Sequence, residues 1–144
     1  DVVTPSPVSI EFPQLLSDVP SVNLKAYSIE TVIAEKFHTM LDRDVFNSRM
    51  KDFFDCYQLF LRFDINEQEL YQAIKATFSN RQLENTPGRM LFTTEFANGE
   101  ERNINWNSFL RKIHWKEKLD FPTVMNLLRQ KLKPLEERYW KEMG

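Results

Sequence analysis

Glycine and cysteine are scarce in this chain: its 144 residues include three glycines and one cysteine. Because the sequence contains no Gly-Gly or Gly-Ser pair, a glycine-rich loop of the kind that cradles phosphates is not available. The one cysteine, Cys56, cannot form an intramolecular disulfide. We interpret it as a core residue rather than a nucleophile.

Long apolar runs and a strong excess of one charge are also missing. No stretch approaches the roughly 20 apolar residues of a membrane-spanning helix, and no signal-peptide pattern opens the chain. We therefore expect no membrane association and a cytoplasmic location. The net charge of −2 argues against a strongly basic nucleic-acid surface, although it leaves room for a local basic patch. No histidines, cysteines or carboxylates recur at the spacing of metal ligands, so we expect no structural zinc site.

Apolar side chains, by contrast, make up 42% of the sequence, which is enough to form the core of one compact domain. The pattern predicts a mostly α fold (α+β), with five to six helices around one core and one or two short N-terminal strands. In this interpretation residues 1–27 are an extended segment with a strand over residues 8–12. The exposed edge of that strand allows homodimer contacts. Residues 28–144 form the helical domain.

Two stretches after residue 63 have clear helix starts. Asn66 and Asp120 each precede an apolar periodic stretch and are predicted N-caps. Pro134 is expected to interrupt the helix that follows Asp120, which resumes at residue 135. Between these helices, apolar residues at helical spacing predict a helix over residues 101–115. We interpret them as core residues rather than as a base-stacking platform with the nearby cations. The apolar residues are Trp106, Phe109, Leu110 and Ile113, and the cations are Arg102, Arg111, Lys112 and Lys116.

The stretch from residue 28 to residue 63 is the most informative, because it predicts two consecutive helices with charges at core positions. Ser28 is a suitable N-cap for the first helix. Lys36 falls inside the apolar face of that helix, and Arg43 lies two turns further along the same face. The apolar face consists of Ile29, Val32, Ile33, Phe37, Met40 and Leu41. The polar side carries Glu30, Glu35, His38, Thr39 and Asp42.

The second helix is apolar nearly all round, and such a helix is normally buried. Asp52 falls on the same face as Cys56 and Leu59, whereas Asp55 lies at the edge of a narrow polar stripe. The stripe is formed by Lys51, Asp55, Gln58 and Arg62. The larger apolar face is formed by Met50, Phe53, Phe54, Tyr57, Phe60 and Leu61.

A buried lysine or aspartate is costly unless it is paired or meets a ligand. One interpretation is a structural Lys36–Asp52 ion pair between two packed helices, with Arg43 extending to solvent. The other is a wall of an active site that faces a phosphate or a metal ion. In both, Lys36 and Asp52 face each other across the helix pair. We favour a cleft in which water reaches both charges, which predicts a coupling free energy of about 1 kcal/mol or less.

Residues 28–43 and 48–55 resemble the second half of the AbiEii/AbiGii-type nucleotidyltransferase toxins, a type IV toxin–antitoxin family. Members carry a helix with the pattern Leu-Glu-x-x-x-Ala-Glu-Lys, followed by a helix with the pattern Arg-x-x-Lys/Arg-Asp-x-x-Asp-Leu. The resemblance implies that Lys36 and Asp52 match the two C-terminal active-site positions of the family. Asp55 and Arg43 are second-rank candidates. The fold it implies is the helical half of a nucleotidyltransferase.

The resemblance also implies a reaction and partners. A nucleotide is transferred from an NTP to an RNA, such as a tRNA, or to a protein, with Mg²⁺ and release of pyrophosphate. Lys36 would neutralise a triphosphate oxygen, and Asp52 would orient Lys36 or help to hold the metal or the acceptor. A cognate antitoxin is expected. The alternative is a non-enzymatic helical domain that binds a protein or an RNA and keeps Lys36–Asp52 as a structural pair.

Part of the family pattern is missing from this chain. Members carry an upstream Gly-Gly/Ser loop and a strand with paired aspartates that hold the divalent metals. Here the single Asp-x-Asp sequence is formed by Asp42 and Asp44 at the end of a predicted helix. We therefore expect a C-terminal part of a longer protein, in which residues 1–27 are the remnant of the nucleotidyltransferase core. The metal ligands are expected to lie outside this chain, and the chain alone is expected to be inactive.

Overall fold

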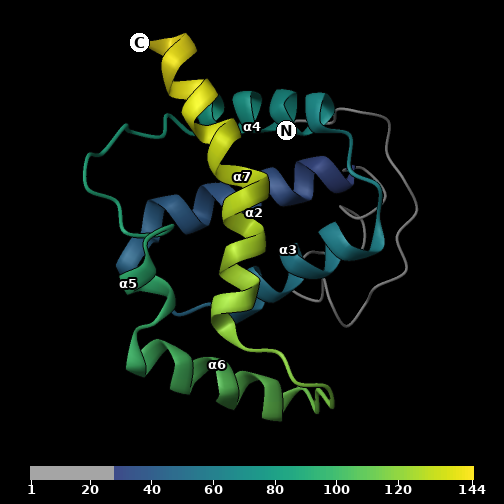
Figure 1. Cartoon of the computed structure of the whole chain (residues 1–144). Helices are drawn as coiled ribbons and strands as arrows, with labels where there is room; N and C mark the ends of the chain where they lie inside the picture. The colour runs from purple at the N-terminus through teal and green to yellow at the C-terminus, as the bar shows by residue number, and fades with distance from the viewer. Residues whose placement is uncertain (1–27) are drawn as a thin grey trace.

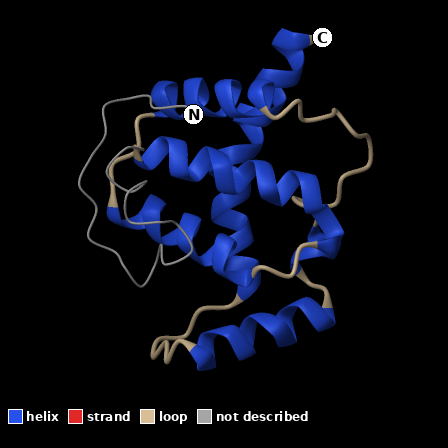
Figure 2. Cartoon of the chain, turned by 180° about the vertical axis from the view of Figure 1, so that it is seen from behind, coloured by secondary structure: helices blue, strands red, loops and turns tan. Residues whose placement is uncertain are grey.

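The computed structural model describes residues 28–144, and within that range it is helical without strands (Figures 1 and 2). The mostly α prediction is confirmed for these residues. The predicted strand over residues 8–12, the extended segment 1–27 and the homodimer contacts lie outside them. The elements are α2 (Ile29–Arg43), the 3₁₀ helix η1 (Asp44–Phe46), α3 (Met50–Arg62), α4 (Glu67–Asn80), α5 (Thr94–Ala97), α6 (Glu100–Lys112) and α7 (Phe121–Met143).

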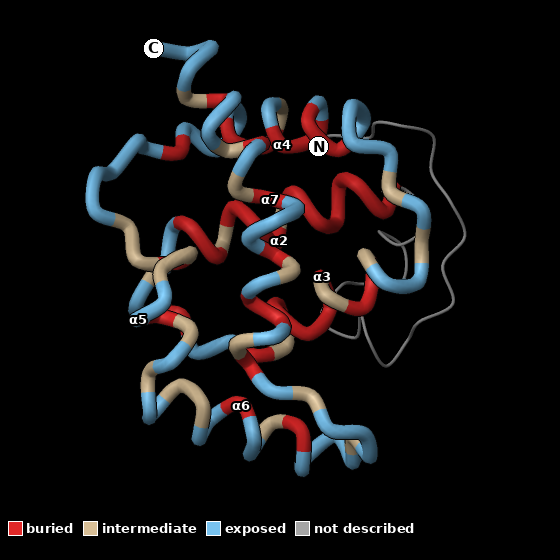
Figure 3. The backbone as a smooth tube through the Cα atoms, in the orientation of Figure 1, coloured by how far each residue is buried: buried red, intermediate tan, exposed pale blue. Residues whose placement is uncertain are grey.

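The helices pack around α2 and α3, and both of these are buried along much of their length (Figure 3). Helix α4 packs against α2, while α3 contacts α2, α6 and α7. The long helix α7 crosses in front of α2 and places its C-terminal end beside α4 (Figure 1). None of the helices in residues 28–144 has the length and apolar content needed to cross a membrane.

The three predicted N-caps are confirmed. The Ser28 hydroxyl accepts a hydrogen bond from the Thr31 backbone N–H at 3.1 Å. The side chain of Asn66 accepts from the Glu69 N–H at 2.8 Å, and that of Asp120 from the Thr123 N–H at 2.9 Å. Each cap satisfies one of the backbone donors that the first turn of a helix leaves without an intrahelical partner.

Of the four apolar residues predicted as core in the 101–115 helix, Trp106 and Leu110 are buried and Phe109 is partly buried. Trp106 is fully buried, and its indole N–H donates to the Leu119 carbonyl at 2.9 Å. Its ring lies 5.4 Å from that of Phe121, which packs at a right angle on Phe53 with centroids 5.3 Å apart. Ile113 is an exception, because it lies past the end of α6 and is 40% exposed. Trp106 is therefore not available to stack on a base.

The predicted interruption at Pro134 is wrong. Helix α7 is continuous from Phe121 to Met143, with Pro134 inside it. Proline cannot donate the backbone hydrogen bond to the residue four positions earlier. The helix continues because its apolar face remains packed on both sides of the proline: Leu128 and Leu132 are fully buried, and Leu135 is nearly so.

Replacing the exposed Pro134 with alanine should therefore raise the free energy of unfolding by about 1–3 kcal/mol. Alanine restores the missing donor and keeps the packed face. Urea unfolding measures the effect. Pro122→Ala is the matched control, because Pro122 lies in the first turn of α7, where proline is well accommodated, and its replacement should bring no such gain. A destabilising Pro134→Ala change would indicate that the helix is locally broken there.

His38 was predicted on the polar side of its helix, but its side chain is buried. It is 8% exposed, and its ring lies edge-on to Phe78 with centroids 6.3 Å apart. Its Nδ1 atom has no hydrogen-bond partner in the part of the chain that the structure describes. The pKa of His38 lies below its usual 6.5, chiefly because burial disfavours the charged ring and secondarily because Arg81 is near.

This lowered pKa predicts a pH dependence of stability. Above pH 6.5 His38 is neutral in both states. As the pH falls below 6.5, the unfolded chain binds the proton first, so the free energy of unfolding should decrease until the folded-state pKa is reached. Urea unfolding between about pH 5 and 8 tests this. His38→Gln should remove the decrease in the free energy of unfolding that the titration of His38 causes below pH 6.5. His114→Gln, at an exposed position, should leave that decrease unchanged. Identical slopes for His38→Gln and the unmodified chain would contradict the assignment.

Candidate functional site

Helices α2 and α3 bring the two first-rank candidates together. Lys36 lies one turn after the buried Val32, so its side chain runs between the two helices rather than into solvent. Its Nζ lies 3.1 Å from Oδ1 of Asp52, which is in the first turn of α3. The prediction that Lys36 and Asp52 face each other is confirmed.

Asp55 is a second partner for the same ammonium group. Its Oδ2 lies 3.4 Å from Lys36 Nζ and 2.7 Å from Lys51 Nζ. Asp55 was predicted at the edge of a polar stripe, but it is fully buried. The predicted exposure of Gln58 on the same stripe is also wrong, because its side chain is buried at 5% exposure. Leu61, which was predicted on the buried apolar face, is 58% exposed. Helix α3 is therefore rotated so that Asp52 and Asp55, one turn apart, both face Lys36.

Arg49 and Lys51 complete the arrangement, and neither was among the predicted site residues. Arg49 Nε lies 3.4 Å from Asp52 Oδ2, and Lys51 Nζ lies 2.7 Å from Asp55 Oδ2. Their spacings of three and four residues from these aspartates are those of facing pairs on a helix, which is the signal that could have found them. We call Lys36, Arg49, Lys51, Asp52 and Asp55 the charge cluster.

The inner part of the charge cluster is buried. Lys36 is 6% exposed, Asp52 is 2% exposed and Asp55 is fully buried. The outer cations are more accessible, with 43% of the Arg49 side chain and 25% of the Lys51 side chain exposed. The predicted cleft, in which water reaches Lys36 and Asp52 freely, is therefore wrong. Charges removed from water in this way are strongly coupled to their partners.

Arg43 does not join the charge cluster. It is exposed at the C-terminal end of α2, seven residues after Lys36 and so about 10 Å further along the helix axis. It lines a hollow between that end of α2 and the loop after α4, together with Arg81 and Arg89. The structure thus brings together Lys36, Asp52 and Asp55 of the predicted site residues and leaves Arg43 apart.

The charge cluster suits an anionic ligand better than a metal ion. Magnesium requires oxygen ligands, but Asp52 and Asp55 each already pair with two cations. Residues 28–144 contain no group of three or more histidine, cysteine or carboxylate side chains arranged to hold a metal. The described donor set therefore does not fit magnesium, and we assign no role to that ion here. Arg49 and Lys51 are the cations of the cluster that solvent reaches, so an anionic group such as a phosphate would approach from their side.

Comparison with known proteins gives one family. The family model described as "Nucleotidyl transferase AbiEii toxin, Type IV TA system" matches residues 1–129 and so includes the whole charge cluster. No curated protein and no solved structure matches the chain.

Proposed function

Because this chain belongs to the AbiEii nucleotidyl transferase toxin family of Type IV toxin–antitoxin systems, we propose that its charge cluster forms part of a nucleotide-transfer site. The substrate is an NTP, and the acceptor is an RNA or a protein. One observation carries the proposal beyond the family match: the ammonium group of Lys36 is held between two carboxylates, 3.1 and 3.4 Å away. A cation fixed in this way can stabilise developing charge on a transferred phosphoryl group without further reorganisation.

In this proposal the residues of the cluster have different roles. Lys36 neutralises an oxygen of the triphosphate, and Asp52 and Asp55 orient it. Arg49 and Lys51 lie at the accessible edge and add positive charge where a phosphate enters. The metal ligands come from residues outside the described range, in keeping with the paired aspartates that the family resemblance places upstream. We also propose a cognate antitoxin as partner and a cytoplasmic location.

A second candidate function is favoured by the burial of the cluster. A helical domain that binds a protein or an RNA without catalysis would use Lys36, Asp52 and Asp55 only to join α2 to α3. Their exposure of 6%, 2% and 0% is what a structural network requires. The two candidate functions make different predictions for a variant of the charge cluster that remains stably folded. The catalytic function predicts that such a variant loses nucleotide transfer, whereas the non-catalytic function predicts no transfer in either form.

The function is tested on the protein encoded by the complete gene. It is incubated with each labelled NTP, Mg²⁺ and pools of total RNA and of protein, and label transfer is measured. We expect transfer by the complete protein and none by the 144-residue chain. Transfer by the chain alone that is lost on Lys36→Ala would overturn the proposal that the site needs further residues. Absence of transfer by the complete protein to either pool would favour the non-catalytic candidate.

A further inference from the structure

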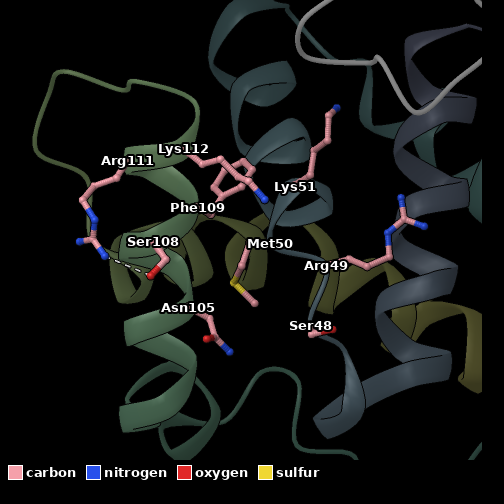
Figure 4. A pocket seen from close by; sticks show the side chains of 9 residues that line it. All are labelled: Ser48, Arg49, Met50, Lys51, Asn105, Ser108, Phe109, Arg111 and Lys112. Atoms are coloured by element: carbon pink, nitrogen blue, oxygen red, sulfur yellow. Dashed lines mark hydrogen bonds between the residues drawn. The ribbon is translucent and has the colours of Figure 1, made fainter.

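A basic groove lies beside the charge cluster, between the start of α3 and the exposed side of α6 (Figure 4). Its volume is about 700 Å³. Among the lining residues that the structure describes, four are cations and none is acidic, although the chain as a whole has a net charge of −2. We call it the basic groove; it is lined by Ser48, Arg49, Met50, Lys51, Asn105, Ser108, Phe109, Arg111 and Lys112.

The cations of the basic groove come from two helices and differ in their partners. Arg49 and Lys51, from α3, pair with Asp52 and Asp55 of the charge cluster. Arg111 donates to the Ser108 hydroxyl at 3.1 Å (Figure 4), and neither it nor Lys112 forms a salt bridge with any residue in 28–144. Both are exposed. The α6 side of the groove therefore offers positive charge that no carboxylate of the described chain neutralises.

The helix dipole does not account for the two cations at the start of α3. Arg111 and Lys112 lie in the last turn of α6, where the helix dipole favours cations. Arg49 and Lys51, however, lie at the start of α3, where the dipole disfavours them. A negatively charged ligand in the basic groove would be attracted by both pairs of cations and by the N-terminal end of α3.

The shape of the groove favours a chain of phosphates. Its α6 side extends from Asn105 to Lys112, which is about 10 Å along the helix axis and longer than one phosphate group. Ser48, Asn105 and Ser108 add neutral hydrogen-bonding groups, and the partly buried Phe109 offers an aromatic edge. A positively charged groove with hydrogen-bonding and aromatic groups is typical of sites that follow a single-stranded nucleic-acid backbone.

We propose that the basic groove binds the sugar-phosphate backbone of the RNA that receives the nucleotide. Arg49 and Lys51 belong to both the groove and the charge cluster, so an RNA bound there reaches the accessible side of the cluster. Arg111 and Lys112 are positioning residues in this arrangement, because they contact the acceptor away from the reacting end. The role of the RNA as acceptor rests on the proposed nucleotide transfer, whereas its binding in the groove does not.

The test is a fluorescence-anisotropy titration of the 144-residue chain with a labelled single-stranded RNA of about 12 nucleotides, without NTP or Mg²⁺. The Arg111→Glu/Lys112→Glu variant should bind at least about tenfold more weakly. A milder Arg111→Gln/Lys112→Gln variant should lower the slope of log affinity against log salt by about 1.4, as expected for two lost phosphate contacts on a single strand. Circular dichroism checks that both variants fold.

Lys75→Glu/Lys141→Glu is the matched control, with the same change in charge at two exposed lysines on α4 and the end of α7. It should change the affinity for RNA by less than about twofold, because salt screens the interaction between an RNA in the groove and charges at distant positions. Equal weakening by the groove and control variants would overturn the proposal. So would displacement of the RNA by ATP, or by poly-glutamate, at lower concentrations than by unlabelled RNA.

The same variants separate this inference from the proposed function. If the complete protein transfers nucleotides but the groove variant binds RNA normally, the inference fails and the proposed function remains. If the basic groove binds RNA but no transfer occurs, the proposed function fails and the RNA site remains.

Discussion

Replacing Lys36 with methionine should lower the free energy of unfolding by about 3–5 kcal/mol. Methionine is similar in length and fills the space between α2 and α3, so the main loss is electrostatic. The change leaves Asp52, which is 2% exposed, and the fully buried Asp55 without the ammonium group between them. Urea unfolding of the 144-residue chain measures the effect.

The same substitution at an exposed pair provides the control for Lys36→Met. Lys133 pairs with Glu137 on α7, where both side chains are about half exposed. Lys133→Met should change stability by no more than about 0.5 kcal/mol, as is usual for surface ion pairs. If Lys36→Met is as mild as Lys133→Met, water reaches the charge cluster, and the burial that the structure shows is not maintained in solution.

Nucleotide transfer by the complete protein should fall by roughly 10²- to 10³-fold when Lys36 is replaced with methionine. The loss is expected because methionine removes the positive charge that Asp52 and Asp55 hold between them. Asp52→Asn keeps the size of the side chain and removes its charge. It should also reduce transfer, because Lys36 then loses one of the two carboxylates that orient it.

Loss of activity must be separated from loss of stability. Leu132→Ala is a suitable control, since Leu132 is fully buried on α7 and is not part of the charge cluster. It should cost about 2–5 kcal/mol, comparable to Lys36→Met. At a temperature where both variants are folded, Leu132→Ala should retain transfer. Equal losses of transfer by the two variants would mean that instability alone explains the effect of Lys36→Met.

Features determined by neighbouring residues could be predicted from the sequence. The caps at Ser28, Asn66 and Asp120 depend on a side chain and a backbone donor three positions later, so no tertiary information is needed. The position of Lys36 on the apolar face of α2 likewise follows from helical spacing. The pairing of Lys36 with Asp52 was predicted because each is a charge among apolar neighbours, and the two balance each other.

Features determined by packing could not be predicted in the same way. Asp55 and Gln58 looked solvent-facing because they lie near Lys51 and Arg62 in helical projection. Which side of α3 meets α2 is decided by the whole helix assembly, and Lys36 and Lys51 make the burial of Asp55 possible. Pro134 is a second case in which packing decides the structure. A proline disfavours a helix locally, but the helix continues because residues of α7 on both sides of Pro134 are packed in the core.

The double variant Lys36→Met/Asp52→Leu tests the central claim most directly, because it removes the pair without leaving one charge buried opposite an apolar side chain. Asp55 retains Lys51 at 2.7 Å, so much of the stability lost in Lys36→Met should return, with a coupling between the two positions above about 2 kcal/mol. Label transfer by the complete protein with this variant is the measurement. We predict restored stability and no transfer. Restored stability with transfer at the unmodified rate would show that Lys36 and Asp52 are only a structural pair.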